Sequence, residues 1–174
     1  INQGKSEMPR KGLYFGGNRM KVPSDTYHWM VYCIDWKTGK ILWKQERQRL
    51  ERVGDRGFFK MAYSTPLVQE IDGIAQLVAT SAEHVAAYDT QTGKELWWMP
   101  YIGFSLVGRP SFGNGMFYVV GSVSQDKHAI YAIRPGSQGK VPEEQVAWHH
   151  ANGIGHVPSP LLVGKEIYVV DDDG

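Results

Sequence analysis

The stretch Ala87-Tyr88-Asp89-Thr90-Gln91-Thr92-Gly93-Lys94-Glu95-Leu96-Trp97 decides the fold, because it encodes a β-hairpin that recurs along the chain. The residues before Asp89 combine small and aromatic side chains that suit a pleated strand. The Asp89 carboxylate can accept hydrogen bonds from the backbone two residues on, and Gly93 can take the positive φ that closes a short turn. Residues 95–99 predict the returning strand, which carries Trp97 at a fixed distance from the turn.

The same pattern occurs earlier, over residues 33–43, where every matching position is displaced by 54 residues. The matching residues of this earlier copy are Asp35, Gly39, Lys40 and Trp43. A third, looser copy ends at Trp148, after a longer turn that begins with Arg134 in place of the Asp. An internal repeat is indicated because two turn residues, a Lys and a Trp all recur at the same distance in sequence.

The rest of the chain divides into units of four predicted strands. In the unit after Trp97, strands are expected at 116–121, 129–133 and 145–149. They are preceded by residues 108–112, the entry segment with which the innermost strand of the unit begins. Each unit spans roughly 45–55 residues, and antiparallel four-stranded units of that length are typical of β-propeller blades. The sequence therefore predicts an all-β propeller with three nearly complete blades and part of a fourth. The expected blades cover approximately residues 13–46, 58–100, 104–150 and 156–174.

Three blades open their innermost strand with a similar segment. These segments are Ser64-Thr65-Pro66, Arg109-Pro110-Ser111 and Pro158-Ser159-Pro160. A blade cannot bury both of its faces alone, so it must stack on its neighbours. We expect the repeated Trp to fill the gap between successive blades and to offer its indole N–H to a neighbouring backbone carbonyl.

The segments beside the hairpins are less regular. Residues 1–12 are polar and predict a loop, whereas residues 12–17 predict a short strand. Residues 46–57 alternate Arg with Glu and Asp, which favours a helical turn or solvated loop over a basic binding patch, because the acids cancel most of the charge. The chain starts without Met and stops directly after a predicted strand, so we expect it to be a piece of a longer protein.

Composition excludes several classes of partner. The net charge of +1 provides no field that would attract nucleic acid or an anionic membrane. We expect no membrane span, because no apolar run approaches the roughly 20 residues that a membrane helix needs. The single cysteine, Cys33, cannot form an intrachain disulfide or a paired-cysteine metal site.

The pattern Ala-x-Asp-x-x-Thr-Gly-Lys-x-x-Trp resembles the tryptophan-docking repeat of the pyrroloquinoline-quinone (PQQ)-like β-propellers of bacteria. The resemblance extends from about Leu13 to Asp173, with Cys33 in the Ala position of the first copy. It implies a structural role for the repeated residues. The expected docking residues are Trp43, Trp97 and Trp148, supported by the turn residues Asp35, Asp89, Gly39 and Gly93.

The resemblance implies two functions, since the family contains non-enzymes and enzymes on one scaffold. The first is a non-catalytic scaffold of an exported bacterial protein, in the periplasm or cell envelope, that binds a protein, a ligand or the remaining blades of its own chain. The non-enzymes resemble either the periplasmic lipoprotein of the outer-membrane β-barrel assembly machinery or the many exported bacterial proteins of PQQ-like repeats, and neither implies a cofactor. The phrases at residues 64–68 and 158–163 look most like the second group. The alternative is part of a quinoprotein dehydrogenase that depends on PQQ and calcium. Those enzymes typically carry two adjacent cysteines against the quinone, which the lone Cys33 cannot supply.

Two residues are predicted as ligand contacts because propellers bind ligands at the ends of their inner strands and in the adjoining loops. Arg109 belongs to the innermost strand of its unit, and His84 begins the third strand of the preceding one. The alternative for Arg109 is an ion pair with an acid of the neighbouring blade. No Ser/His/Asp arrangement with the geometry of a nucleophile elbow is present in the sequence.

A histidine group near the C-terminus raises the question of a metal enzyme. His149, His150 and His156 lie close in sequence to residues 171–173, which are all Asp. Neighbouring residues on a strand point to opposite faces, so His149 and His150 cannot readily share an ion. The Asp run lacks the alternating spacing of a calcium loop and favours a solvated turn. We therefore predict no metal site and no catalytic residue.

Overall fold

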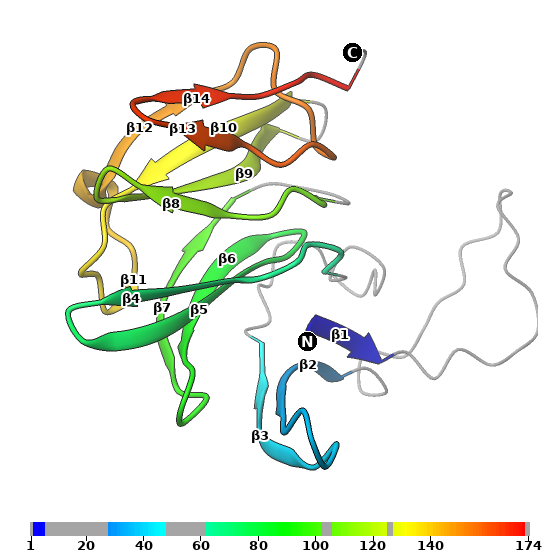
Figure 1. The fold of residues 1–174 in the computed structure, drawn as a ribbon. Coiled ribbons are helices and arrows are strands. Elements are labelled where there is room, and N and C mark those ends of the chain that lie inside the picture. The colour runs from blue at the N-terminus through cyan, green and yellow to red at the C-terminus, as the bar shows by residue number, and fades with distance from the viewer. Residues whose placement is uncertain (1, 6–27, 48–61, 102–105, 125–126, 173–174) are drawn as a thin grey trace, which may run out of the picture.

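The computed structural model describes residues 2–5, 28–47, 62–101, 106–124 and 127–172. These residues form four sheets that follow one another from the N-terminal to the C-terminal end of the molecule (Figure 1). Neighbouring strands are antiparallel, with one exception described below. The molecule is all-β, as predicted, and its sheets are arranged as the blades of a β-propeller.

The first sheet contains β1 (Asn2–Lys5), β2 (His28–Ile34) and β3 (Ile41–Glu46), in that order. The hairpin of β2 and β3 confirms the two strands predicted there. The loop predicted for residues 1–12 is wrong at residues 2–5, which pair with β2. A polar segment becomes a strand there because an open sheet edge supplies its backbone partners, whatever its own propensity. The strand predicted at 12–17 lies outside the described residues.

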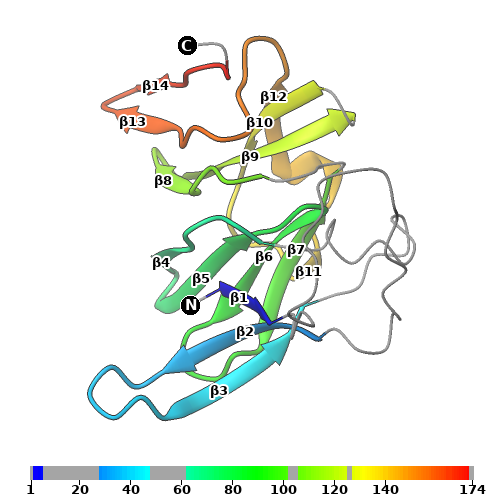
Figure 2. The same cartoon turned by 90° about the vertical axis from the view of Figure 1, so that its right-hand side faces the viewer.

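The second sheet is the most complete unit. Its antiparallel strands are β4 (Leu67–Ile71), β5 (Ile74–Thr80), β6 (His84–Asp89) and β7 (Glu95–Pro100), in sequence order. A short fifth strand, β11 (Gly139–Lys140), joins the outer edge of β7 and runs parallel to it. It comes from the lengthened turn of the third repeat copy, so one unit reaches across to the edge of its predecessor (Figure 2).

The third sheet contains β8 (Ser111–Gly113), β9 (Met116–Ser124), β10 (Lys127–Ile133) and β12 (Val146–His150), with β8 at its inner edge. The three longer strands confirm those predicted at 116–121, 129–133 and 145–149. A single turn of 3-10 helix, η3 (Glu143–Gln145), precedes β12.

The last sheet is the hairpin of β13 (Leu161–Val163) and β14 (Glu166–Tyr168). It stacks beyond the third sheet, as the first two strands of a further unit would (Figures 1 and 2).

The two matching turns are built in the same way. In the first, Asp35 Oδ1 accepts the backbone N–H groups of Lys37 (3.1 Å) and Thr38 (2.7 Å). In the second, Asp89 Oδ1 accepts those of Gln91 and Thr92, both at 2.8 Å. The closing residues Gly39 and Gly93 have φ values of 70° and 75°, a region that favours glycine. The hydroxyl and N–H of Thr38 lower the pKa of Asp35, and chiefly the Thr92 N–H lowers that of Asp89.

The hydrophobic core lies mainly between the second and third sheets. Its largest fully buried members include Trp97, Phe117, Leu106, Ile133 and Val78. A much smaller cluster lies between the first and second sheets. It contains Val31, Ala79, Ala86 and Tyr88, with Trp43, Leu77 and Trp98 packed against it. The sheets therefore stack through continuous side-chain contact, as the blades of a propeller do.

The entry segments of successive units are also hydrogen-bonded to one another. The Ser64 hydroxyl donates to the Gly108 carbonyl at 2.8 Å. The N–H of Arg109 donates to the Ser159 hydroxyl at 2.9 Å. The Ser and Pro pattern at these segments therefore links each innermost strand to the one in the next unit.

Candidate functional site

The first hairpin contacts the second sheet through Trp43. Its indole N–H donates to the carbonyl of Thr90, in the matching turn of the second sheet, at 2.8 Å. The ring lies directly against Gly93, since a Cβ placed on that glycine would be 2.6 Å from Trp43 Cε3. Glycine is therefore required at position 93 for two reasons, its positive φ and the lack of space for a side chain beside the Trp43 indole.

The second hairpin makes a different contact with the third sheet. Trp97 is buried, and its indole N–H donates to Gln76 Oε1 of its own sheet at 2.9 Å. Its ring lies 5.5 Å from that of Phe117 in the third sheet. The matching turn of that sheet begins at Arg134 and is longer, so the chain lays Gly139 beside Trp97 instead. In the third copy, Trp148 is 40% exposed and lies 6.0 Å from Tyr118 of its own sheet.

The predicted ligand contact His84 lies in a buried polar environment. Its Nδ1 is 3.1 Å from the Ser81 hydroxyl, which donates to the His84 carbonyl at 2.9 Å, so Nδ1 carries the proton. Burial, followed by the charge of Arg47, lowers the pKa of His84 to about 3. The imidazole is therefore neutral at pH 7. Arg47 is itself buried, and that burial lowers its pKa.

The second predicted contact, Arg109, precedes β8 and has an exposed side chain. Within the described residues, no hydrogen bond or ion pair joins it to His84. The structure does not bring the two predicted residues into one site, and a ligand role for either stays a prediction.

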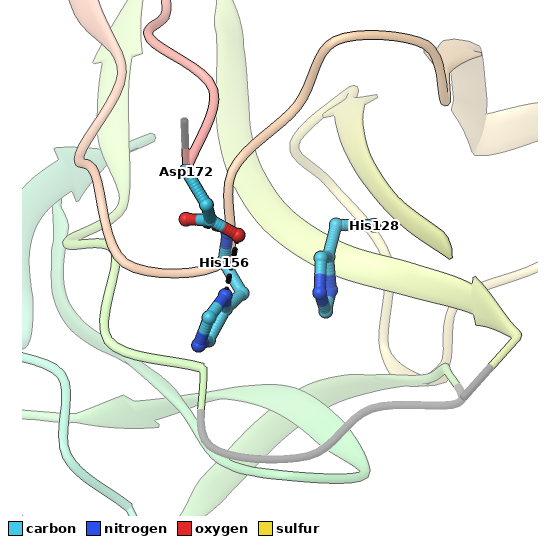
Figure 3. A group of neighbouring side chains, drawn as sticks. All are labelled: His128, His156 and Asp172. Carbon is cyan, nitrogen blue, oxygen red and sulfur yellow. Dashed lines mark hydrogen bonds and ion pairs between the residues drawn. The ribbon is translucent and has the colours of Figure 1, made fainter. Parts of the chain in front are cut away.

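A different group of side chains meets between the third and fourth sheets (Figure 3). His156 Nδ1 donates to Asp172 Oδ2 at 2.5 Å, and the His156 backbone N–H donates to Asp172 Oδ1 at 3.0 Å. The ring of His128, on β10, stacks on that of His156, with 4.9 Å between centroids and 28° between planes. One potential ligand atom from each of the three residues lies within 4.8 Å of the others.

The sequence places His156 and residues 171–173 near His149 and His150, and no metal site was expected among them. In the structure, His149 and His150 are exposed and lie outside the group of His128, His156 and Asp172, and the ring of His149 stacks on Tyr131 at 5.7 Å. Sequence reasoning missed His128 because it precedes the other members by a strand and a long turn. The available signal was the repeat itself. His128 Nδ1 lies 2.9 Å from Ser122 Oγ, and one unit earlier His84 Nδ1 lies 3.1 Å from Ser81 Oγ.

The Asp172 carboxylate accepts hydrogen bonds from the loop before β13. Partial desolvation raises the pKa of its carboxyl group, but the hydrogen bonds from His156 and Val157 outweigh that effect and lower it below its usual value. Gly155 allows this close approach, since a Cβ there would be 2.6 Å from Asp172 Oδ1. Asp171 and Asp172 are exposed at a turn, and Asp172 also bonds the loop before β13 through the backbone N–H of His156.

Comparison with known proteins identifies one family. A family model described as outer membrane protein assembly factor BamB matches residues 28–174. No curated protein gives a match. Within the described part of the chain, no helix is long and apolar enough to cross a membrane.

Proposed function

The chain belongs to the PQQ-like β-propeller repeat family whose model is described as outer membrane protein assembly factor BamB, and we propose that it is a non-catalytic propeller scaffold. Its task is to bind another protein in the bacterial cell envelope, after export to the periplasm. The family membership supports the envelope assignment. It also supports an interaction function, because BamB is described as an assembly factor.

The proposal rests on one observation, which is that the repeated Asp and Trp residues form hydrogen bonds that hold turns and sheets together. Asp35 and Asp89 accept the N–H groups of their own turns. Trp43 and Trp97 lie at sheet interfaces with their indole N–H groups bonded. Residues occupied in this way hold the scaffold together and are not available to act on a substrate.

In this proposal the repeated Trp residues dock each blade to the next. Trp43 contacts the following turn, and Trp97 contacts the following sheet through Phe117. Trp148 has the same position in its unit and is 40% exposed, so it would be covered by a further blade or by a partner. No cofactor is needed for such a role.

The surface proposed for the partner lies on the β13–β14 hairpin and the residues that follow it. Its exposed apolar residues are Leu161, Val163, Tyr168 and Val170. Apolar side chains beside a strand edge suit an occupant that adds a strand to the sheet, either another protein or the remaining blades of the same one, because main-chain hydrogen bonds then extend the ladder.

A photo-crosslinking experiment tests the binding function. A crosslinking amino acid at Tyr168, which is 58% exposed, should capture one discrete protein in bacterial envelopes. The same amino acid at exposed Glu144, in η3, is the matched control and should capture none. Absence of any product at Tyr168, or equal labelling at both positions, would contradict the proposal.

A second experiment tests the absence of catalysis. The purified protein is incubated with PQQ and Ca²⁺, and dye reduction is measured with alcohols and sugars. We expect no turnover of substrate and no quinone bound to the protein in stoichiometric amount. Substrate-dependent dye reduction would overturn the scaffold assignment in favour of a quinoprotein dehydrogenase.

A further inference from the structure

We propose that His128, His156 and Asp172 bind a transition-metal ion of the Zn²⁺ type, which fastens the β13–β14 hairpin to the third sheet. The three side chains come from separate segments, which are β10, the loop before β13 and the turn after β14. One nitrogen or oxygen from each lies within 4.8 Å of the others, as Figure 3 illustrates. Long-range convergence of two imidazoles and a carboxylate is the arrangement that a metal ion requires.

The donor atoms select the class of metal. Two imidazole nitrogens and one carboxylate oxygen suit Zn²⁺, Co²⁺, Ni²⁺ and Cu²⁺, whereas Mg²⁺ and Ca²⁺ prefer oxygen ligands throughout. Three protein ligands leave a fourth position for water. His156 and Asp172 are 32% and 34% exposed, so an ion and its water can reach them from the solvent.

Two of the ligands are already held in place. Asp172 receives the backbone N–H and the Nδ1–H of His156, which fixes both partners in one orientation. His128 Nδ1 lies 2.9 Å from Ser122 Oγ, and in the tautomer in which Nδ1 donates to that hydroxyl we assign Nε2 as the ligand atom. An ion that binds His156 through Nδ1 would displace the proton from that nitrogen, and the proton would move to Nε2, so that the imidazole stays neutral. Outer hydrogen bonds of this kind orient metal-binding histidines in proteins.

Binding requires a modest movement of the rings. Imidazole lone pairs lie in the ring plane, so the stacked rings of His128 and His156 must turn for both nitrogens to face one ion. Ligand atoms of a tetrahedral zinc site are about 3.4 Å apart, from metal–nitrogen distances of about 2.0–2.1 Å. The torsion that turns an imidazole about its Cβ–Cγ bond is broad, but turning His156 also breaks its bond to Asp172, which the bonds to the ion would replace.

The consequence is a further link between two sheets that are already joined by apolar packing and by a few hydrogen bonds. Near the site, the fourth unit is held by the bond from the Val107 N–H to the His156 carbonyl, at 3.0 Å. An ion joining β10 to both flanks of the hairpin would restrict its opening. Ligands that bind only the folded form stabilise it in proportion to their free concentration.

The direct test is a titration of the metal-free, untagged chain with Co²⁺, read by its visible absorption, and with Zn²⁺ by calorimetry. We expect one ion per chain, and at least tenfold weaker binding in the variants His128→Gln and Asp172→Asn. Both replacements keep hydrogen-bonding groups, and circular dichroism verifies that they fold. The matched control is His150→Gln, an exposed histidine outside the group, which should bind as the wild type does.

A second readout follows the hairpin itself. Hydrogen exchange at residues 161–168 should slow several-fold on adding Zn²⁺ in the wild type and in His150→Gln, but not in His128→Gln. The proposal is overturned if metal binding does not saturate or if His128→Gln binds the metal with full affinity. It is also overturned if several histidines bind the metal weakly and the substitutions leave that binding unchanged. The last outcome would identify adventitious surface binding only.

Discussion

The contact between the first and second sheets and the contact between the second and third sheets use the same repeated tryptophan in different ways. At the first contact, Trp43 is half-buried and bonds to a backbone carbonyl, with buried Arg47 nearby at the end of β3. At the second, Trp97 is fully enclosed and bonds to Gln76 inside its own sheet, against Phe117. The described apolar core is correspondingly much larger at the second contact.

The difference shows that the receiving turn, and not the tryptophan, sets the type of contact. The turn at Asp89 matches the repeat and presents a free carbonyl and a bare Gly93 to Trp43. The turn at Arg134 is longer and places β11 along β7 instead. The following predictions, taken from the largest expected effect to the smallest, test the two contacts and their surroundings through the free energy of unfolding in urea.

Replacing Trp97 with Ala should have the largest effect. The side chain is 2% exposed, so its removal leaves a cavity in the main core and an unbonded Gln76. Such changes cost about 3–5 kcal/mol. The companion variant Trp43→Ala should cost about 1–2 kcal/mol, because only part of the ring is buried. Equal losses would contradict the distinction between the two contacts.

The variant Gly93→Ala should cost about 2–3 kcal/mol, combining a positive φ with overpacking against Trp43. Its control is Gly39→Ala, which has nearly the same φ, 70° against 75°, but nothing within 4 Å of the added Cβ. The control should lose only about 1–2 kcal/mol from strain. A difference near zero would show that the indole does not depend on a bare glycine.

Stability near the first contact should depend on pH through His84. Its pKa is about 3 when folded and 6.5 when free, so the unfolded chain binds more protons between those values and folding weakens as pH falls. The loss between pH 6.5 and 5.5 should be about 1 kcal/mol. In His84→Asn, which retains a donor toward Ser81, this part of the slope should disappear. An unchanged slope in the variant would show that other groups cause it.

The smallest effect is expected for Trp43→Phe. The ring is largely retained and a single hydrogen bond to the Thr90 carbonyl is lost, which costs about 0.5–1.5 kcal/mol. Its double variant with Gly93→Ala should be less destabilised than the two losses added together, because the smaller ring relieves the overpacking. Simple additivity would argue against direct contact between the two residues.

The hairpins could be predicted from the sequence because their signals are local. Asp89 and Gly93 act within one turn, through hydrogen bonds and a φ value that depend on few neighbours. The recurrence of that turn predicted the four-stranded units and the family. Neither the pairing of residues 2–5 with β2 nor the strand at Gly139 carries such a signal, since each forms only on an edge that another segment supplies.

The sequence by itself determined the repeat and the turns, because these follow from short-range chemistry repeated at a regular spacing. Only the tertiary structure decided which tryptophan meets a carbonyl and which meets a glutamine. It also brought His128 to His156 and Asp172, far apart in the chain. The physical reason is that the position of such contacts depends on the register and stacking of separate sheets, which no local stretch of sequence specifies.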